Sequence, residues 1–216
     1  MIGCADITGL VLAGGRGSRM GGLDKGLQPF RGEPLVRHSV RRLQGQSGGL
    51  IGGLMINANR NLSTYEGLGL PVWPDPLPGQ VGPLAGFLAG LQHCPTSYLL
   101  TVPCDSPLLP VDLALRLASA FEDPRTEIAV AAAPGTDGVL RPQPVFCLMA
   151  VHLLHSLAAF TRDGGRKVGQ WTGQHRAVLV PFDREGDDPQ AFFNANTLEE
   201  LQSLEHTGTP HPSVPT

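Results

Sequence analysis

A glycine-rich, positively charged segment near the start of the chain has the residue types that bind a nucleoside triphosphate. An apolar run over Ile7–Ala13 ends at Gly14 and Gly15, and Arg19 and Lys25 follow soon after it. Glycine lets backbone N–H groups turn toward a ligand and approach it closely, and the cationic side chains can reach the same anion. The pattern therefore predicts a buried strand that leads into a phosphate-binding loop.

Two common phosphate-binding motifs do not fit this loop. In the dinucleotide fingerprint G-x-G-x-x-G, counted from Gly15 and Gly17, the third glycine position holds Met20. In the Walker A motif the lysine is followed by Ser or Thr, whereas Lys25 is followed by Gly26. The sequence therefore argues against an NAD-binding protein and against a P-loop enzyme.

Polar residues also follow the next predicted strands of the chain. These apolar strands are predicted at Leu50–Ile56, Leu70–Trp73 and Tyr98–Val102. They are followed by Asn57, Asp75 and Asp105. Each residue alone has an ordinary interpretation as a loop or helix cap. Because ligands of open α/β sheets bind outside the carboxyl ends of the strands, the three together predict one shared site.

The elements that must position these residues alternate between strands and helices in the first half of the chain. Helices are predicted at Leu35–Gln44, Leu84–Cys94, Val111–Phe121, Ala150–Phe160 and Leu198–Leu204. This alternation predicts an α/β, Rossmann-like fold of three αβα layers with a mostly parallel sheet. The second half is less regular, and Gln143–Leu148 is a candidate antiparallel strand. The glycine-rich stretch Gly45–Gly53 is interpreted as a surface insertion.

Composition limits the classes of protein to consider. The chain has 216 residues, of which 41% are hydrophobic, and we expect one domain over residues 1–206 with a disordered tail at 207–216. The formal net charge of −3 argues against nucleic acid as a partner. We see neither a signal peptide nor an apolar run that could span a membrane. Four scattered cysteines argue against a metal cage or disulfide framework and favour a cytoplasmic protein.

The glycine-rich loop resembles the nucleotidyltransferase signature L-A-G-G-x-x-x-R-M-x-x-x-K, which runs here from Leu12 to Lys25. Further motifs follow in order: Asn57-Ala-Asn-Arg60, Asp75, Gly82-Pro-Leu-Ala-Gly86, Pro103-Cys-Asp105, Arg141-Pro-Gln-Pro144 and Asn194-Ala-Asn-Thr197. In combination, and over residues 7–205, they resemble the molybdenum cofactor guanylyltransferase (MobA) family.

The resemblance implies a nucleotide-binding fold of the glycosyltransferase-A type and a specific reaction. The family transfers GMP from GTP to the phosphate of Mo-molybdopterin, releasing pyrophosphate and forming the guanine dinucleotide cofactor. It implies nucleotide contacts at Leu12, Ala13, Gly14, Lys25, Asn57, Asp75 and Asp105, with Asp105 also holding Mg²⁺. The substrates are then GTP and Mo-molybdopterin, and proteins that deliver or receive the cofactor are further partners to consider.

Elementary chemistry agrees with these assignments. The attacking phosphate is already an anion, so the reaction needs no strong general base. The difficulty is repulsion between two polyanions and charge on the leaving pyrophosphate, which Mg²⁺ at Asp105 can neutralise. Arg19 and Lys25 can stabilise the triphosphate and the transition state. Gly15 is a candidate for the base pocket, since a side chain there would fill it; the alternative is a flexible turn.

The motif near the C-terminus supplies candidates for the second substrate. Asn194 and Asn196 flank an alanine just before a predicted helix. They either face the pterin substrate or cap the helix. Arg166 and Lys167 either meet the pterin phosphate or belong to a solvated loop.

Three other functions remain as alternatives. A molybdopterin cytidylyltransferase typically reads L-A-A-G where this chain has Leu12-Ala-Gly-Gly15. A sugar-phosphate nucleotidyltransferase would lack the motifs around Asn57 and Asn194. A non-catalytic nucleotide- or cofactor-binding module would need the cationic loop but no metal-binding Asp105.

Overall fold

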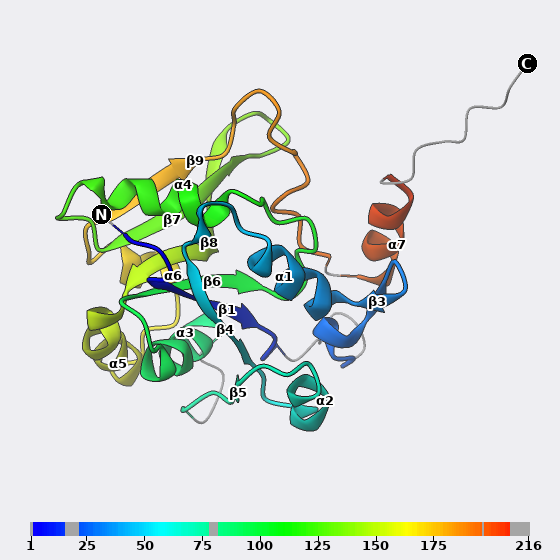
Figure 1. Ribbon diagram of the computed structural model, residues 1–216, viewed down its shortest axis with the longest axis horizontal. Helices are drawn as coiled ribbons and strands as arrows, with labels where there is room; N and C mark the ends of the chain where they lie inside the picture. Colours follow the sequence, from blue (N-terminus) through cyan, green and yellow to red (C-terminus); the bar gives the residue numbers. More distant parts are fainter. Residues whose placement is uncertain (1, 16–21, 78–81, 196, 208–216) are drawn as a thin grey trace, which may run out of the picture.

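The computed structural model describes residues 2–15, 22–77, 82–195 and 197–207. A seven-stranded sheet runs through the centre of the molecule in the order β5-β4-β1-β6-β8-β7-β9 (Figure 1). Its strands are β1 Ile7–Leu12, β4 Ile51–Asn57, β5 Val72–Trp73, β6 Tyr98–Pro103, β7 Ile128–Pro134, β8 Leu140–Ala150 and β9 Ala177–Pro181. Every strand predicted from an apolar run is present, with shifts of a few residues at the ends.

The sheet is mostly parallel, as predicted. β1 pairs in parallel with β4 and with β6, β4 pairs in parallel with β5, and β7 does so with β9. β8 runs antiparallel to both of its neighbours, β6 and β7. The candidate antiparallel strand at Gln143–Leu148 is therefore confirmed as the centre of β8.

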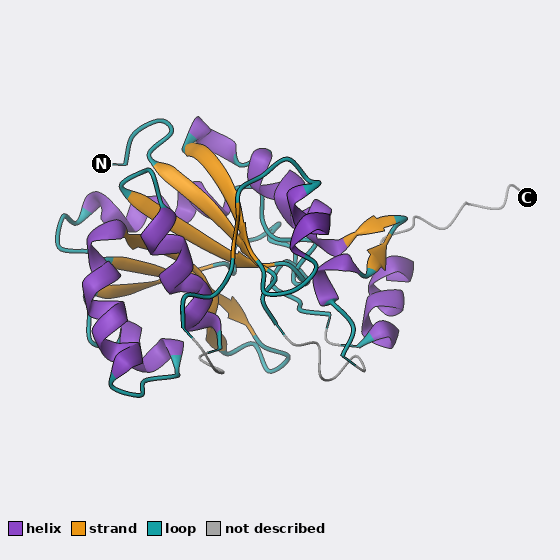
Figure 2. Cartoon of the chain, turned by 90° about the horizontal axis from the view of Figure 1, so that it is seen from below, coloured by secondary structure: helices purple, strands orange, loops and turns teal. Residues whose placement is uncertain are grey.

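Helices cover both faces of the sheet, which confirms the three-layer architecture (Figure 2). Side chains of β1 alternate between the two faces: Ile7 and Val11 enter one buried cluster, and Leu10 enters the other. The first cluster includes residues of α1 Leu35–Gln44, α2 Leu62–Glu66 and α4 Leu113–Ser119. The second includes residues of α3 Pro83–His93, α5 Leu154–Arg162 and α6 Val168–Thr172.

Two helices show how sequence pattern sets the packing. α1 is amphipathic: Val36 and Leu43 are buried, whereas Arg37 and Arg41 lie on its exposed side. α3 is apolar on all sides and almost wholly buried, which places it directly against the sheet. Gly90 makes this contact close, because a Cβ atom built there would lie 2.5 Å from Leu10 Cδ2.

A small β-hairpin is formed by residues 29–34. β2 Pro29–Phe30 pairs antiparallel with β3 Glu33–Pro34. Arg31 and Gly32 join them with φ values of 49° and 79°, the positive φ pair that a tight hairpin turn requires. The hairpin packs against an element from the far end of the chain.

That element is α7 Leu198–Thr207, which lies beside the hairpin at one side of the molecule (Figure 1). Leu201 and Leu204 pack with Phe30 and Leu35 in a third buried cluster. The helix ends at Thr207, so it extends into the first residue of the predicted tail; residues 208–216 lie outside the described residues. No helix in the described part of the chain is both long and apolar enough to cross a bilayer.

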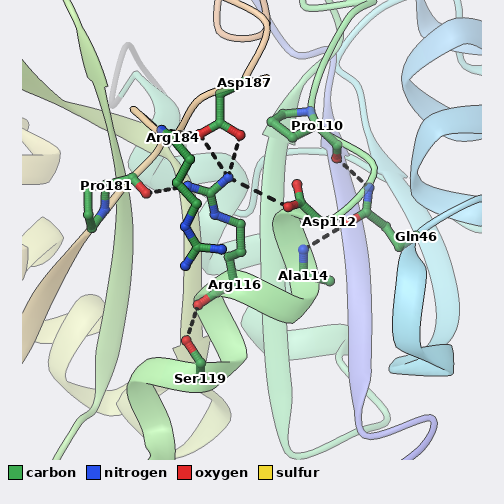
Figure 3. A network of polar contacts seen from close by, with 9 residues as sticks. All are labelled: Gln46, Pro110, Asp112, Ala114, Arg116, Ser119, Pro181, Arg184 and Asp187. Carbon is green, nitrogen blue, oxygen red and sulfur yellow. Dashed lines mark hydrogen bonds and ion pairs between the residues drawn. The ribbon is translucent and has the colours of Figure 1, made fainter.

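The glycine-rich connection between α1 and β4 is held to α4 through Gln46 (Figure 3), while Gly45 and residues 47–49 are exposed. Gln46 Nε2 donates to the Pro110 carbonyl at 2.8 Å, and Gln46 Oε1 accepts from the Ala114 backbone N–H at 2.8 Å. The Gln46 side chain thereby satisfies a backbone N–H in the first turn of α4, as a helix cap does.

The other end of this network holds α4 to the end of β9. Arg116 is 5% exposed, and its guanidinium donates to Asp187 Oδ1 at 2.7 Å and to the Pro181 carbonyl at 2.5 Å (Figure 3). The guanidinium also lies 3.8 Å from the centre of the Phe182 ring. A buried charge needs such partners to offset its lost hydration.

Candidate functional site

The strand-end residues predicted from sequence come together at one edge of the sheet. The pairing sets Leu12 of β1 beside Asn57 of β4 and beside Pro103 of β6. Asn57 in turn lies opposite Trp73 of β5. Because these strands are parallel, the residues that follow them leave the sheet on the same side.

An amide and carboxylate network joins three of these strand ends. Asn57 Nδ2 donates to Asp75 Oδ1 at 2.9 Å and to the Trp73 carbonyl at 3.0 Å. Asn59 Nδ2 donates to Asp75 Oδ2 at 2.8 Å and to the Gly14 carbonyl at 3.1 Å. The Asp75 backbone N–H in turn donates a hydrogen bond to Asn59 Oδ1 at 2.8 Å. Asp75 is therefore held rigidly by two asparagine amides beside the glycine turn.

Two glycines make room for this network. A Cβ atom built on Gly14 would lie 2.7 Å from Asn59 Nδ2 and 3.0 Å from Asn57 Oδ1. One built on Gly86 of α3 would lie 2.5 Å from Leu12 Cδ2 and 2.6 Å from Asn57 Oδ1. Asn57 is thus packed tightly between β1 and α3: a side chain at Gly86 would displace it, whereas one at Gly14 would press first on the Asn59 amide.

Gly15 differs from Gly14 in its surroundings. It is exposed, and no atom of the described residues lies within 4 Å of a Cβ built on it. A side chain at Gly15 would therefore point away from the described part of the network. The backbone before it is held in the sheet, since the Ala13 N–H donates to the Asn57 carbonyl at 2.8 Å.

Lys25 and Asp105 form the charged part of the site. Lys25 Nζ lies 2.6 Å from Asp105 Oδ2, and the two side chains are 19% and 12% exposed. Asp105 follows β6, and Lys25 lies in a short 3₁₀ helix, η2 Lys25–Leu27. A cation and a carboxylate that are both partly accessible can interact with the phosphate groups of a substrate and with a metal ion, respectively.

The predicted pterin-binding segment reaches the same place from the far end of the chain. Ser106 Oγ donates to Asn194 Oδ1 at 2.5 Å, and the Ala195 N–H donates to the Asp105 carbonyl at 3.2 Å. Asn194 therefore lies beside the charged pair. Arg19 and Asn196, also predicted site residues, lie outside the described residues. Arg166 is turned to its own loop, where it donates to the Thr161 and Gly165 carbonyls.

Sequence reasoning did not single out several residues that shape the site. Asn59 and Gly86 lay inside quoted motifs, so their presence there was the available signal. Asp24 likewise lay inside the quoted signature, directly before Lys25, whereas Tyr65 had no such signal. Tyr65 Oη donates to Asp24 Oδ1 at 2.6 Å although the two are far apart in sequence. The pKa of the Tyr65 hydroxyl is raised mainly by burial and further by its hydrogen bond to Asp24, so the hydroxyl stays protonated and donates this bond.

A metal at this edge would depend on Asp105. Among the described residues, no group of three or more His, Cys, Asp and Glu side chains is placed to hold an ion. A carboxylate oxygen suits a hard divalent cation, and Mg²⁺ usually takes one or two carboxylates together with substrate phosphates and water. The Asp105 carboxylate, on a side chain that is 12% exposed at the end of β6, fits that mode of binding.

Comparison with known proteins places this chain among nucleotidyltransferases. Residues 9–178 match the family model described as the MobA-like NTP transferase domain. The chain is 60% identical over 210 residues to the molybdenum cofactor guanylyltransferase of Albidiferax ferrireducens, covering 95% of this chain and 99% of that protein. It is 61% identical over 213 residues to the protein of the same name from Acidovorax sp. strain JS42, covering 96% and 99%.

Solved structures show the same fold at low identity. The molybdopterin-guanine dinucleotide biosynthesis protein A of Archaeoglobus fulgidus matches with a TM-score of 0.72 and 20% identity, over 93% of this chain and 97% of that one. The 4-diphosphocytidyl-2C-methyl-D-erythritol synthase of Anaerococcus prevotii matches with a TM-score of 0.67 and 10% identity, over 93% and 95%.

Proposed function

The chain belongs to the molybdenum cofactor guanylyltransferase family and is a nucleotidyltransferase, and we propose that it transfers GMP from GTP to Mo-molybdopterin at the edge formed by β1, β4, β5 and β6. One observation carries the location. The Lys25–Asp105 pair and the Asp75–asparagine network lie at the ends of neighbouring strands, and Asn194 lies beside Asp105. A charged centre thus stands between a candidate base site and a candidate pterin site.

The base site consists of Gly14, Asn57 and Asp75, with Leu12, Ala13 and Gly15 lining the turn. Guanine has two adjacent donors, N1–H and the exocyclic amine, which a carboxylate can accept together. Each Asp75 oxygen takes one asparagine amide in the structure, and a carboxylate oxygen has a second lone pair for a further donor. The two asparagines therefore orient Asp75 without using up its capacity to accept.

The choice of guanine over cytosine is supported by Gly14. In the cytidylyltransferase pattern L-A-A-G an alanine takes this position. In this chain an added Cβ at Gly14 would lie 2.7 Å from Asn59 Nδ2. An alanine here would push the Asn59 amide away from its observed position, so the network favours glycine, in agreement with the guanylyltransferase pattern.

In the proposed reaction Lys25 stabilises the negative charge of the triphosphate. Its ammonium stands where the triphosphate approaches Asp105 and can stabilise the charge that develops on the leaving pyrophosphate. Arg19, which precedes it in the loop, is proposed to act on the same triphosphate. The pterin phosphate is already an anion and attacks the α-phosphorus of GTP, so the phosphorus–oxygen bond to pyrophosphate breaks as the new one forms. Positioning and charge stabilisation account for the catalysis, with no side chain required as a base.

Enzymes of this family generally use a divalent metal, and we propose Mg²⁺ held by Asp105. When bound, the ion would supply positive charge that lowers the repulsion between the two substrates. Lys25, within 2.6 Å of Asp105, keeps a second positive charge at the same point.

Asn194 is proposed to face the pterin substrate together with Asn196. The hydrogen bond from Ser106 fixes the Asn194 side chain beside the loop that carries Asp105. The proposed substrates are thus GTP and Mo-molybdopterin, and proteins that deliver or receive the cofactor are proposed partners. We place the reaction in the cytoplasm, where the four unpaired cysteines of the chain would remain reduced.

The test is to incubate the purified chain with Mg²⁺, Mo-molybdopterin and each of the four nucleoside triphosphates in turn, following pyrophosphate release. We expect release with GTP that depends on the pterin. Faster release with CTP would overturn the base assignment. GTP binding without any release would favour a binding module instead.

A further inference from the structure

The segment that follows β4 contacts the glycine-rich loop at several points. Arg60 donates from its two terminal nitrogens to the carbonyls of Gly22, at 2.9 Å, and Gly15, at 3.2 Å. Asn61 Nδ2 donates to Asp24 Oδ2 at 2.9 Å, and Tyr65 Oη donates to Asp24 Oδ1 at 2.6 Å. These contacts fall on both the strand side and the Lys25 side of the loop.

Asp24 accepts two of these side-chain hydrogen bonds. Asp24 is a buried residue, 8% exposed, and each of its carboxylate oxygens accepts from a different side chain of the segment. Gln28 Nε2 donates to its carbonyl at 2.8 Å. A buried carboxylate held by two donors is costly to displace, because displacement would leave a charge without partners.

Tyr65 also contacts the loop on the other side of Lys25. A Cβ atom built on Gly26 would lie 2.5 Å from Tyr65 Oη, so the backbone after Lys25 rests directly on the hydroxyl. Tyr65 is the buried residue of α2, whose other side chains are exposed. The short helix thus places one tyrosine under the two neighbours of Lys25.

We propose that Arg60, Asn61 and Tyr65 are positioning residues that clamp the glycine-rich loop and hold Lys25 against the triphosphate. None of them is required to touch the substrate. Tyr65 and Asn61 act through Asp24, and Asp24 through the backbone of Lys25. The proposal rests on the proposed function for its effect on turnover, whereas the clamp itself is a property of the free protein.

The decisive variant is Tyr65→Phe, which removes the hydroxyl and keeps the ring. The matched control is Tyr98→Phe, which alters the second of the two tyrosines, at the opposite end of β6 from Asp105. We expect Tyr65→Phe to lower kcat for GTP-dependent pyrophosphate release about tenfold, since small displacements of charge-stabilising groups are costly. Tyr98→Phe should match the wild type. Equal kcat values for the two variants would overturn the proposal.

A double-mutant cycle separates positioning of Lys25 from a general effect on the fold. In a Lys25→Ala background the Tyr65→Phe change should have almost no further effect on kcat, because the group that it positions is gone. A second tenfold loss in that background would show that Tyr65 does not act through Lys25. Asp24→Asn, which keeps an acceptor for Tyr65, should retain more activity than Asp24→Ala.

Hydrogen exchange tests the clamp independently of the reaction. The Leu27 and Gln28 amides donate to the Asp24 and Lys25 carbonyls. They should exchange about tenfold faster in Tyr65→Phe than in the wild type or Tyr98→Phe. Unchanged exchange would refute the clamp, and this result can be read even if the wild type proves inactive with GTP. Inactive wild-type protein with faster exchange in Tyr65→Phe would refute only the proposed function.

Discussion

Replacing Gly86 with alanine tests whether the contact between α3 and the base site matters for the nucleotide. The new Cβ would lie 2.5 Å from Leu12 Cδ2 and 2.6 Å from Asn57 Oδ1, so both side chains must move. Overpacking of a buried site costs about 1–3 kcal/mol. Alanine in place of a helical glycine returns about 1 kcal/mol. We therefore expect the free energy of unfolding to fall by about 0–2 kcal/mol, which lowers Tm by at most about 8 °C in a chain of this size.

The effect on GTP should exceed this loss of stability. Asn57 holds Asp75 through its amide nitrogen, so displacing the Asn57 side chain also displaces the carboxylate proposed to read the base. We expect the KM for GTP to rise about tenfold to a hundredfold with a smaller change in kcat, the pattern of lost ground-state binding. Steady-state pyrophosphate release at varied GTP, at a temperature well below Tm, measures both constants.

Gly90→Ala is the matched control, because it lies one turn along the same helix. Its Cβ would lie 2.5 Å from Leu10 Cδ2 and 2.8 Å from Leu99 Cδ2, a comparable clash with core residues instead of site residues. The two variants should lose similar stability, measured by thermal unfolding. If both raise the KM for GTP alike, or neither does, the reasoning about Asn57 and Asp75 is wrong.

Three further predictions concern charged residues. Asp105→Ala should lower kcat by about 10²–10³-fold, measured as pyrophosphate release, because the site loses its carboxylate; near-normal turnover would exclude Asp105 as the metal ligand. Arg116→Met should lower the free energy of unfolding, measured by denaturant titration, by about 3 kcal/mol, since it leaves the half-buried Asp187 without its partner. Arg125→Met removes a member of an exposed ion pair and should cost under about 1 kcal/mol in the same titration. The Arg116 hydrogen bond holds the pKa of Asp187 below its usual value, so its contribution to stability is present above the ordinary aspartate pKa of about 3.9 and is lost as the pH falls through the lowered pKa; acid titration of Asp187→Asn should therefore show a shallower loss of stability than the wild type.

Much of the fold follows from local pattern. Helix α1 begins and ends at the predicted residues because its apolar positions repeat with the helical period and Pro34 and Gly45 bound it. Strands β1 and β6 were predicted because continuous apolar runs suit strands that are buried on both faces. The antiparallel direction of β8 was predicted only as a candidate, from the less regular order of elements in the second half, since an apolar run does not encode whether its neighbours are parallel.

The candidate site was predictable in its outline for a related reason. Parallel strands that are each followed by a polar residue must present those residues at one edge, whatever the details of packing. Gly14, Asn57, Asp75 and Asp105 could therefore be grouped from their order along the chain. The hydrogen-bond partners of these residues could not be predicted, because Asn57 and Asn59 both donate to Asp75 only when β4 and β5 are paired.

By itself, then, the sequence determined which residue types stand at the ends of the strands and that a glycine-rich, cationic loop leads from the first of them. Those properties belong to short segments and need no knowledge of distant ones. Tertiary structure decided that Lys25 meets Asp105, that Asn194 returns to the same edge and that Tyr65 lies beneath the loop. Each of these contacts joins residues far apart in the chain, so it exists only when the sheet and its helices bring the segments together.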